Sequence, residues 1–359
     1  MRTAVFLVAS TLLAQNAAPP VVSPEVHADR RVTLRMRAPN AKQVALVTDW
    51  MGRGESKPLT KDGDGVWSVT VGPLEPSTYI YSFQVDGVTM ADPVNPRVKL
   101  RAFGSGSFVE VPDRGAVWQE RDVPHGKVEI NWQKSSVLGG ETRWIWIYTP
   151  PGYAQSGKRY PVLYLLHGSN DTAAGWTMAG QANFIFDNLL AEKKMTPMVV
   201  VMPFGHAVPF GQREARGKDN GALFEDYLLR DVIPTVRANY RVETGRERTA
   251  IAGLSMGGGQ ALRIGFGHMD LFSAVGAFSA AVPQDFESAF GASLKDANAK
   301  LKTVWFGCGK QDSLFGRAEK LDELLTARGV GHTFLATDGA HNFTIWRKHL
   351  AEFAPLLFR

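Results

Sequence analysis

The sequence of 359 residues contains a single cysteine, Cys308, which excludes a disulfide bond within the chain. Its 40 lysines and arginines exceed its 35 acidic residues by five, and they form no basic block of the kind that binds a nucleic-acid backbone. The sequence also shows no internal repeat and no cluster of side chains at metal-ligand spacing. We therefore expect a protein stabilised by packing, with no metal, no cofactor and no nucleic-acid partner.

Long apolar runs are scarce too, and the one that stands out lies at the N-terminus. Met1 and Arg2 precede an apolar run at residues 4–13, and small and polar residues follow it, which is the pattern of a secretory signal. The run is too short to span a bilayer. We predict a signal peptide at residues 1–18, no membrane span, and a mature protein exported to the periplasm or the cell exterior.

The sequence does contain two regions that differ in their pattern of apolar residues, and two domains are expected for a chain of this length with 44% hydrophobic residues. Residues 22–111 hold short alternating segments closed by turns, which predict a small all-β, immunoglobulin-like sandwich. The acidic turn at residues 61–65 lacks the later ligands of a calcium loop, so we interpret it as a hairpin turn. Residues 112–127 are predicted to be a linker. The expected strands of the sandwich are residues 32–36, 43–47, 66–71 and 79–85.

From residue 128 to residue 359 the pattern changes to apolar runs separated by helical stretches. Near-continuous apolar runs are typical of strands that are buried on both faces, so this region predicts a mainly parallel sheet covered by helices on both sides. The expected strands are residues 144–148, 162–166, 198–202, 249–253, 274–278, 303–307 and 333–337, and the expected helices include residues 184–192, 223–239, 317–328 and 345–353.

The stretch I-A-G-L-S-M-G-G-G-Q at residues 251–260 combines a strand, a serine and the start of a helix. A Gly-x-Ser-x-Gly sequence in that setting indicates a sharp turn that exposes the serine hydroxyl above the sheet. Glycines would otherwise weaken the helix by roughly 0.5 to 1 kcal/mol each, so their presence indicates that the backbone needs close approach here. We predict that Ser255 is a catalytic nucleophile.

A serine nucleophile needs a base, and the base needs an orienting acid, in the chain order Ser, Asp or Glu, His for this arrangement. Asp312 follows the expected strand 303–307 and is our predicted acid, while Asp338 is the alternative. His341 follows the last expected strand and is the predicted base. The other histidines after Ser255 are expected to be structural or solvated: His268, His332 and His349.

The oxyanion that forms during ester hydrolysis requires two backbone amides. The first is predicted to be that of Met256, directly after the nucleophile. The second is expected in the loop after strand 162–166, from Ser169 or from Gly168. His167 in the same loop is interpreted as structural, and Cys308 as a small buried residue.

These motifs occur in the order found in esterase D-type hydrolases, and the region 128–359 resembles carbohydrate esterase family 1, the feruloyl and acetyl xylan esterases. The resemblance implies an α/β-hydrolase fold and the same three catalytic residues. The front segment resembles the early-set sandwiches related to family 48 carbohydrate-binding modules. The motifs are Y-P-V-L-Y-L-L-H-G at 160–168, D-V-I-P at 231–234, F-G-C-G-K at 306–310 with Asp312, His341 followed by Trp346 and Arg347, and, in front, G-V-W at 65–67, Tyr79, Tyr81 and Phe83, V-D-G at 85–87 and D-P at 92–93.

Substrate contacts are harder to predict, since the resembling family acts on several esters. Trp176, Phe204 and Trp346 are expected near the catalytic residues, as walls of an acyl pocket or as packing at its rim. His206 is a candidate contact to a sugar. In the front segment, Trp50 and Trp67 either bind carbohydrate or pack.

Three functions follow from this pattern. The first is a secreted serine esterase that releases ferulate or acetate from xylan or arabinoxylan through an acyl-enzyme. The second is a siderophore esterase of the enterochelin type, and the third is a non-catalytic binding protein on a hydrolase fold. For either enzyme we expect residues 128–359 to carry all the ester chemistry, with the sandwich tuning access to polymeric substrate.

Overall fold

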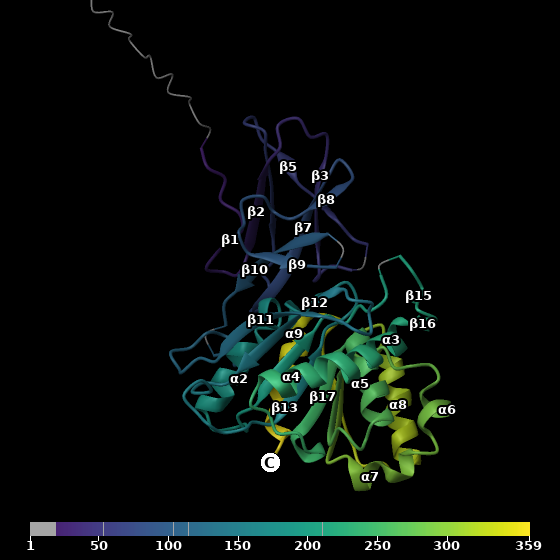
Figure 1. Cartoon of the computed structure of the whole chain (residues 1–359). Helices are drawn as coiled ribbons and strands as arrows, with labels where there is room; N and C mark the ends of the chain where they lie inside the picture. Colours follow the sequence, from purple (N-terminus) through teal and green to yellow (C-terminus); the bar gives the residue numbers. More distant parts are fainter. Residues whose placement is uncertain (1–18, 53, 103, 114, 210) are drawn as a thin grey trace, which may run out of the picture.

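The computed structural model describes residues 19–359 apart from residues 53, 103, 114 and 210, and it shows two regions stacked on one another (Figure 1). A smaller all-β region comes first in the chain, and a larger region of strands and helices follows it. The predicted signal peptide at residues 1–18 lies outside the described residues.

The front region is a β-sandwich of two antiparallel sheets. One sheet has the strand order β1-β2-β6-β5, and the other has the order β4-β3-β7-β10-β9 with β8 beside β7. Apolar side chains such as Leu34, Leu46 and Phe83 are fully buried between the sheets. The strands are β1 (Glu25–Val26), β2 (Val32–Arg37), β3 (Val44–Thr48), β4 (Lys57–Pro58), β5 (Thr60–Lys61), β6 (Val66–Val71), β7 (Ser77–Val85), β8 (Val88–Met90), β9 (Val98–Leu100) and β10 (Ser105–Val111).

The second region is built on an eight-stranded sheet in the order β11-β12-β14-β13-β17-β18-β19-β20. From β14 to β20 all neighbours are parallel, whereas β11, β12 and β14 pair antiparallel. This is the α/β-hydrolase fold. Its strands are β11 (Lys127–Lys134), β12 (Thr142–Thr149), β13 (Val162–Leu166), β14 (Val199–Pro203), β17 (Thr249–Leu254), β18 (Ala274–Phe278), β19 (Thr303–Gly309) and β20 (Thr333–Thr337), and a small hairpin of β15 (Glu214–Ala215) and β16 (Lys218–Asp219) lies apart.

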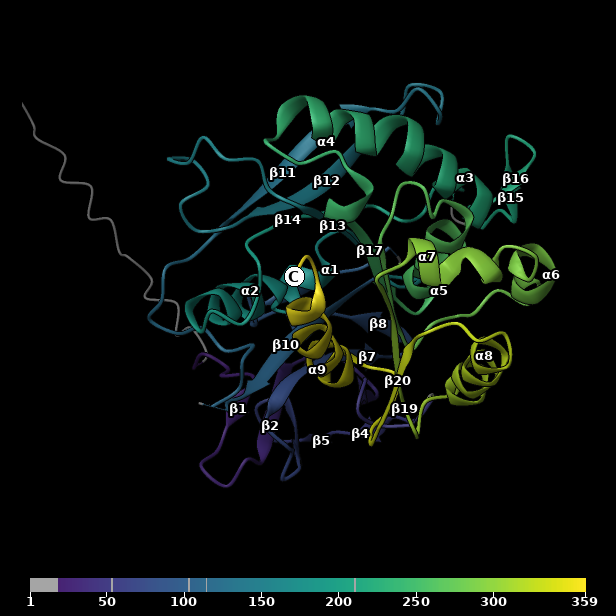
Figure 2. The same cartoon turned by 90° about the horizontal axis from the view of Figure 1, so that it is seen from below.

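Helices cover both faces of this sheet (Figure 2). Side chains of α3, α4, α5 and α8 fill the core on one face, and side chains of α2 and α9 fill the core on the other. The helix expected at residues 223–239 contains a π-helical turn at Leu228–Val232, just before Pro234, which lacks an amide hydrogen. The helices are α1 (Gly175–Met178), α2 (Ala182–Ala191), α3 (Asn220–Tyr227), α4 (Ile233–Asn239), α5 (Met256–Gly267), α6 (Phe286–Phe290), α7 (Ala297–Lys300), α8 (Phe315–Ala327) and α9 (Phe343–Phe353).

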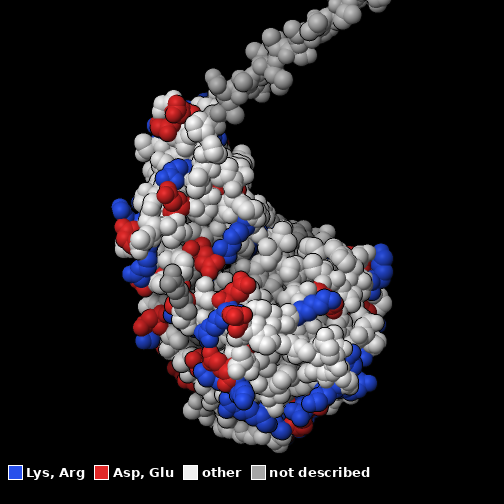
Figure 3. Space-filling model, turned by 90° about the vertical axis from the view of Figure 1, so that its left-hand side faces the viewer, with Lys and Arg blue, Asp and Glu red and all other residues white. Residues whose placement is uncertain are grey.

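The two regions share apolar packing. Ile80 of β7 and Phe108 of β10 belong to the same buried cluster as Trp118, which follows the sandwich, and Trp176 of α1. The sandwich therefore packs against α1 and α9, in the helix layer on one side of the hydrolase sheet. On the side of the molecule in Figure 3, acidic and basic side chains lie interspersed, and no field of one sign dominates that face.

Candidate active site

The strand β17 ends at Leu254 and the helix α5 begins at Met256, so Ser255 alone forms the turn between them. Its backbone has φ 53° and ψ −117°, a conformation that L-residues rarely adopt and that costs about 1–3 kcal/mol. The turn also brings backbone into close contact. A Cβ at Gly253 would lie 2.4 Å from the Gly257 carbonyl oxygen, and one at Gly257 would lie 2.5 Å from the carbonyl oxygen of His167. The glycines are thus required by the strained turn that presents the serine.

Three side chains meet at this turn from the carboxyl ends of three strands. His341 Nε2 lies 3.0 Å from Ser255 Oγ, and His341 Nδ1 lies 2.7 Å from Asp312 Oδ2. The side chain of Asp312 is fully buried, whereas that of His341 is 35% exposed. These distances allow His341 to take the proton of the serine hydroxyl while Asp312 holds the imidazole in orientation.

The carboxylate of Asp312 is kept ionised by its surroundings. Burial raises its pKa, but hydrogen bonds from His341, the Leu314 amide and Ser279 outweigh burial and leave the pKa below its ordinary value. The alternative acid, Asp338, is 84% exposed and pairs with Lys310 at 3.2 Å. The structure therefore joins His341 to Asp312.

The loop after β13 lies against the serine turn. A Cβ at Gly168 would meet Leu254 Cδ1 at 2.6 Å and Ser255 Cβ at 3.3 Å, so Gly168 allows the loop to approach the nucleophile. The next residue, Ser169, is exposed. On the other side of the nucleophile, Met256 is the first residue of α5, and its amide has no acceptor within the helix.

His167 holds this loop in shape and is not part of the hydrogen-bonded set of Ser255, His341 and Asp312. It is fully buried, its Nδ1 donates to the Gly168 carbonyl oxygen at 2.8 Å, and its Nε2 accepts from the Gly205 amide at 2.8 Å. Burial lowers its pKa, which fits the neutral tautomer that these two bonds require. His167 thereby links the loop to the chain that leaves β14.

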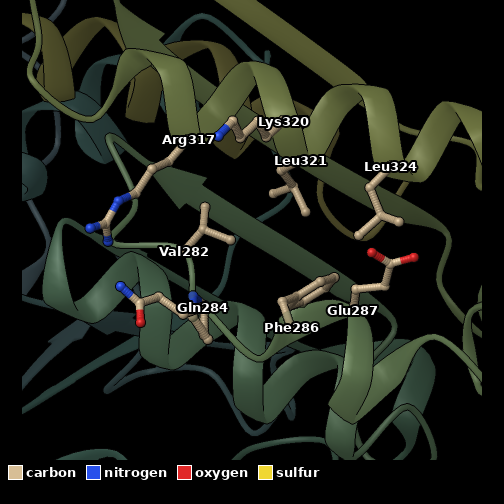
Figure 4. A pocket seen from close by; sticks show the side chains of 9 residues that line it. Val282, Gln284, Phe286, Glu287, Arg317, Lys320, Leu321 and Leu324 are labelled. Carbon is tan, nitrogen blue, oxygen red and sulfur yellow. The ribbon is translucent and has the colours of Figure 1, made fainter.

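A cavity of about 570 Å³ is lined by Met256, the residue that follows Ser255 in the chain, although Ser255, Asp312 and His341 are not among its lining residues. Met256 and Gln260 of α5 form one wall, and Asn220 and Asp285 contribute polar groups from other elements. Figure 4 shows a neighbouring hollow of about 420 Å³, in which Phe286 lies opposite Leu321 and Leu324 of α8. The two hollows share Pro283 and Gln284, so they adjoin. Met256 and Gln260 belong to the motif at residues 251–260, whereas the sequence pattern gave no signal for Asn220 and Asp285, which lie outside every catalytic motif.

The predicted substrate contacts fall into different places. Trp176 is fully buried and donates from Nε1 to the Leu166 carbonyl oxygen at 2.9 Å, so the expectation that it lines an acyl pocket is wrong. Its ring packs edge-on against Phe278 and Phe343, with 5.8 and 5.9 Å between centroids. Trp346 is only 6% exposed, and its ring stands edge-on to His341 with 4.9 Å between centroids. It contacts His341, the predicted base.

Phe204 and His206 are both half-buried beside the loop after β13. The Phe204 ring stacks on His167 with 5.6 Å between centroids. Burial, reinforced by His167 and Arg143, lowers the pKa of His206 to about 4, so its imidazole is neutral at ordinary pH. Both side chains thus contact His167 of the loop after β13, which places them beside the predicted oxyanion donors.

The front tryptophans pack within the sandwich. Trp67 is 8% exposed and donates from Nε1 to the Ala38 carbonyl oxygen at 2.9 Å. Trp50 is half-buried and lies edge-on to Tyr79, with 5.1 Å between centroids. Of the two alternatives for Trp67, the structure shows packing, because a sugar could not reach its ring face.

The remaining histidines have protein partners, and Cys308 is buried. His268 contacts Glu225 at 2.8 Å, His332 contacts Asp322 at 2.9 Å, and the buried His349 contacts Thr337 at 3.1 Å. Burial raises the pKa of the Cys308 thiol to about 12. Within residues 19–359, the described part of the chain holds no group of three or more His, Cys, Asp or Glu side chains placed for a metal ion. No helix in the same described part has the length and apolarity to cross a membrane.

Fold and site together define a serine hydrolase of the α/β-hydrolase class. Residues 135–357 match the Esterase family, described as putative esterases, and the chain belongs to that family. Residues 22–98 match carbohydrate-binding module 48, the isoamylase N-terminal domain, so the sandwich is similar to modules of that kind.

Individual relatives agree with this assignment. The chain is 33% identical over 349 residues to an endo-1,4-beta-xylanase/feruloyl esterase of Xylanibacter ruminicola, a match that includes 94% of this chain and 46% of that protein. The chain thus spans about half the length of that curated relative. A ferulic acid esterase of Anaeromyces mucronatus, solved with ferulic acid, is 26% identical with a TM-score of 0.60 over 69% of this chain and 96% of that one. The enterobactin esterase of Shigella flexneri shares the fold with a TM-score of 0.66 at 20% identity, over 91% of this chain and 92% of that one.

Proposed function

We propose that this protein is an exported esterase that releases ferulate or acetate from acylated xylan or arabinoxylan. The observation that carries the proposal is the hydrogen-bonded set of Ser255, His341 and Asp312 in a chain whose match to a xylanase/feruloyl esterase extends through both regions. The cavity lined by Met256 and Gln260 lies on the helix that follows Ser255, and it supplies space for part of an ester substrate on that side of the site. The signal-like residues 4–13 support export, since polymeric xylan lies outside the cell.

The proposed reaction passes through an acyl-enzyme. His341 Nε2 accepts the proton of the Ser255 hydroxyl as Oγ bonds to the ester carbonyl carbon, and Asp312 stabilises the resulting imidazolium. The carbonyl oxygen becomes an oxyanion, which we assign to the amides of Met256 and Ser169. The imidazolium then gives its proton to the departing sugar alkoxide. A water molecule attacks the acyl-enzyme with His341 again as base, and ferulic or acetic acid leaves as the serine is restored.

The test is a rate comparison on defined esters with the purified protein. Methyl ferulate, acetylated xylan and p-nitrophenyl acetate are supplied to the wild type and to Ser255→Ala, and products are measured by chromatography. The proposal expects turnover of a feruloyl or xylan acetyl ester that depends on Ser255. Hydrolysis of p-nitrophenyl acetate alone would contradict the proposed substrate class. Mass spectrometry of the mature N-terminus in the native host tests export.

A siderophore ester is the second candidate. The likeness to the enterobactin esterase extends over both regions, which favours keeping this candidate, although it concerns the fold. Ferric enterobactin is therefore included in the same panel. Faster turnover of this ester than of methyl ferulate would replace the first proposal with the second.

A further inference from the structure

Lys99 reaches from the sandwich into the hydrolase region. It belongs to β9, it is only 7% exposed, and its Nζ donates to Asp171 Oδ2 at 3.0 Å. Asp171 is 4% exposed and lies in the loop that follows β13. The two residues are 72 positions apart in the chain. Removal of one partner from a buried ion pair is strongly destabilising, because the remaining charge is then buried without a partner.

Asp171 closes the turn that carries the predicted second oxyanion donor. Its amide donates to the Gly168 carbonyl oxygen at 3.2 Å, so Ser169 lies inside the turn. Its Oδ1 accepts from the Thr172 amide at 2.8 Å, which leaves Oδ2 for Lys99. A shift of Asp171 would therefore shift the amide of Ser169 relative to Ser255.

The ammonium group of Lys99 also faces α9, the helix that begins two residues after His341. Lys99 Nζ lies 4.9 Å from the centroid of the Phe343 ring. Phe343 begins α9, two positions after His341, and its ring packs edge-on to Trp346, with 5.0 Å between centroids. Trp346 in turn contacts His341. One side chain of the sandwich thus touches the supports of both the oxyanion loop and the histidine.

We propose that Lys99 is a positioning residue of the active site and that the sandwich completes the oxyanion hole through its ion pair with Asp171. The inference rests on the proposed ester hydrolysis. It also revises the expectation that residues 128–359 suffice for the chemistry. All three relay residues do lie in that part of the chain, but one of the supports for the oxyanion loop comes from the front region.

Docking of the two regions does not depend on this pair. Arg347 of α9 is fully buried and donates to the Ala179 carbonyl oxygen at 3.0 Å, to Ser77 Oγ at 3.0 Å and to the Thr78 carbonyl oxygen at 2.9 Å. Ser77 and Thr78 belong to β7 of the sandwich. Because these bonds and the shared apolar core remain, removal of the Lys99 charge should leave the regions docked, and a loss of activity can be assigned to the loop.

The experiment uses the full chain with Lys99→Met, Lys99→Arg and, as a matched control on the same region, the exposed Lys42→Met. Active sites are titrated with a fluorophosphonate, and kcat and KM are then measured on p-nitrophenyl acetate, which is too small to require contacts with the sandwich. For Lys99→Met we expect a fall in kcat of about 10- to 100-fold, toward the loss caused by removal of one oxyanion donor, with KM within about twofold of wild type. Lys99→Arg should recover most of kcat, and Lys42→Met should equal wild type.

A second readout separates positioning from general damage. A boronic acid inhibitor forms a tetrahedral adduct on Ser255, so its affinity should fall in parallel with kcat in Lys99→Met, while KM for the planar ester stays the same. If Lys99→Met does not fold, the double variant Lys99→Met/Asp171→Asn removes both buried charges and is measured in its place, with the same expected loss. Wild-type kcat per titrated site in either variant would overturn the inference. An inactive wild type would instead overturn the proposed function.

Discussion

The serine turn and the loop after β13 face each other across the same site, yet they are held in different ways. Ser255 is fixed from within the hydrolase region, since its amide donates to the Phe278 carbonyl oxygen at 2.9 Å and its carbonyl oxygen accepts from the Ala281 amide at 2.9 Å. The facing loop is closed by Asp171, whose carboxylate is paired with Lys99 of the sandwich. The serine turn is thus held within the hydrolase region, whereas the facing loop is held both by His167 of that region and by Lys99 of the sandwich. A sequence motif can predict the local bonds that hold Ser255, but it cannot predict a contact between two regions such as that of Lys99 with Asp171.

The largest expected effect comes from a substitution in the serine turn. Ser255→Ala removes the nucleophile, and we expect turnover of any accepted ester to fall by about 10⁶-fold with the fold intact. Circular dichroism and thermal melting serve as the control for folding. Activity within tenfold of wild type would refute the assignment of the nucleophile.

A second substitution tests whether Asp312, the buried residue after β19, is the acid that orients His341. Asp312→Asn cannot hold the correct imidazole tautomer, and we expect kcat to fall by about 10⁴-fold. The matched control is Asp338→Asn, which changes an exposed carboxylate three residues from His341 and should alter kcat only slightly. Steady-state kinetics on one ester compare the two variants, and the opposite ranking would contradict the geometry.

A third substitution, at Arg347, tests how strongly the sandwich is docked on the hydrolase region. Arg347→Met leaves the carbonyl oxygens of Ala179 and Thr78 buried without their donors, and we expect a loss of about 3 kcal/mol in the free energy of unfolding. Urea denaturation gives this quantity, with the exposed Arg230→Met as the control. If both variants match wild type, the bonds of Arg347 contribute little to stability, and the docking of the two regions rests on their shared apolar core instead.

The relay could be predicted from the sequence because its signals are local. Ser255 lies in a strand, turn and helix that the pattern specifies within ten residues, and Asp312 and His341 each follow an apolar run. The supports are not local. Lys99 is an ordinary lysine in a three-residue strand, and only the docking of the two regions places it beside Asp171. The two alternatives for Trp176, a pocket wall or packing, could not be separated for a related reason, since the sequence after a strand does not show whether a side chain is buried.

The smallest expected effect concerns a carboxyl group on the sandwich side of the interface. Asp49 accepts the Ile80 amide at 2.9 Å, and burial raises its pKa to about 6, although the nearby cations Lys99 and Arg347 oppose this. Its folded pKa thus lies above the unfolded value, so the native state binds the proton more readily. This contribution favours folding below about pH 4 and is lost as the pH rises through about 6.

Asp49→Asn keeps an acceptor for Ile80 and removes the charge, so the variant should be more stable than wild type at pH 7.5, by about 1 kcal/mol, since the half-buried side chain keeps some contact with water. Near pH 4 the two proteins should be equally stable, because Asp49 is then neutral in wild type as well. Urea denaturation at both pH values measures this difference, with the exposed Asp122→Asn as the matched control. A difference that is the same at both pH values would show that the substitution acts through packing, whereas a variant less stable than wild type at pH 7.5 would show that the charge of Asp49 strengthens the interface with Lys99 and Arg347.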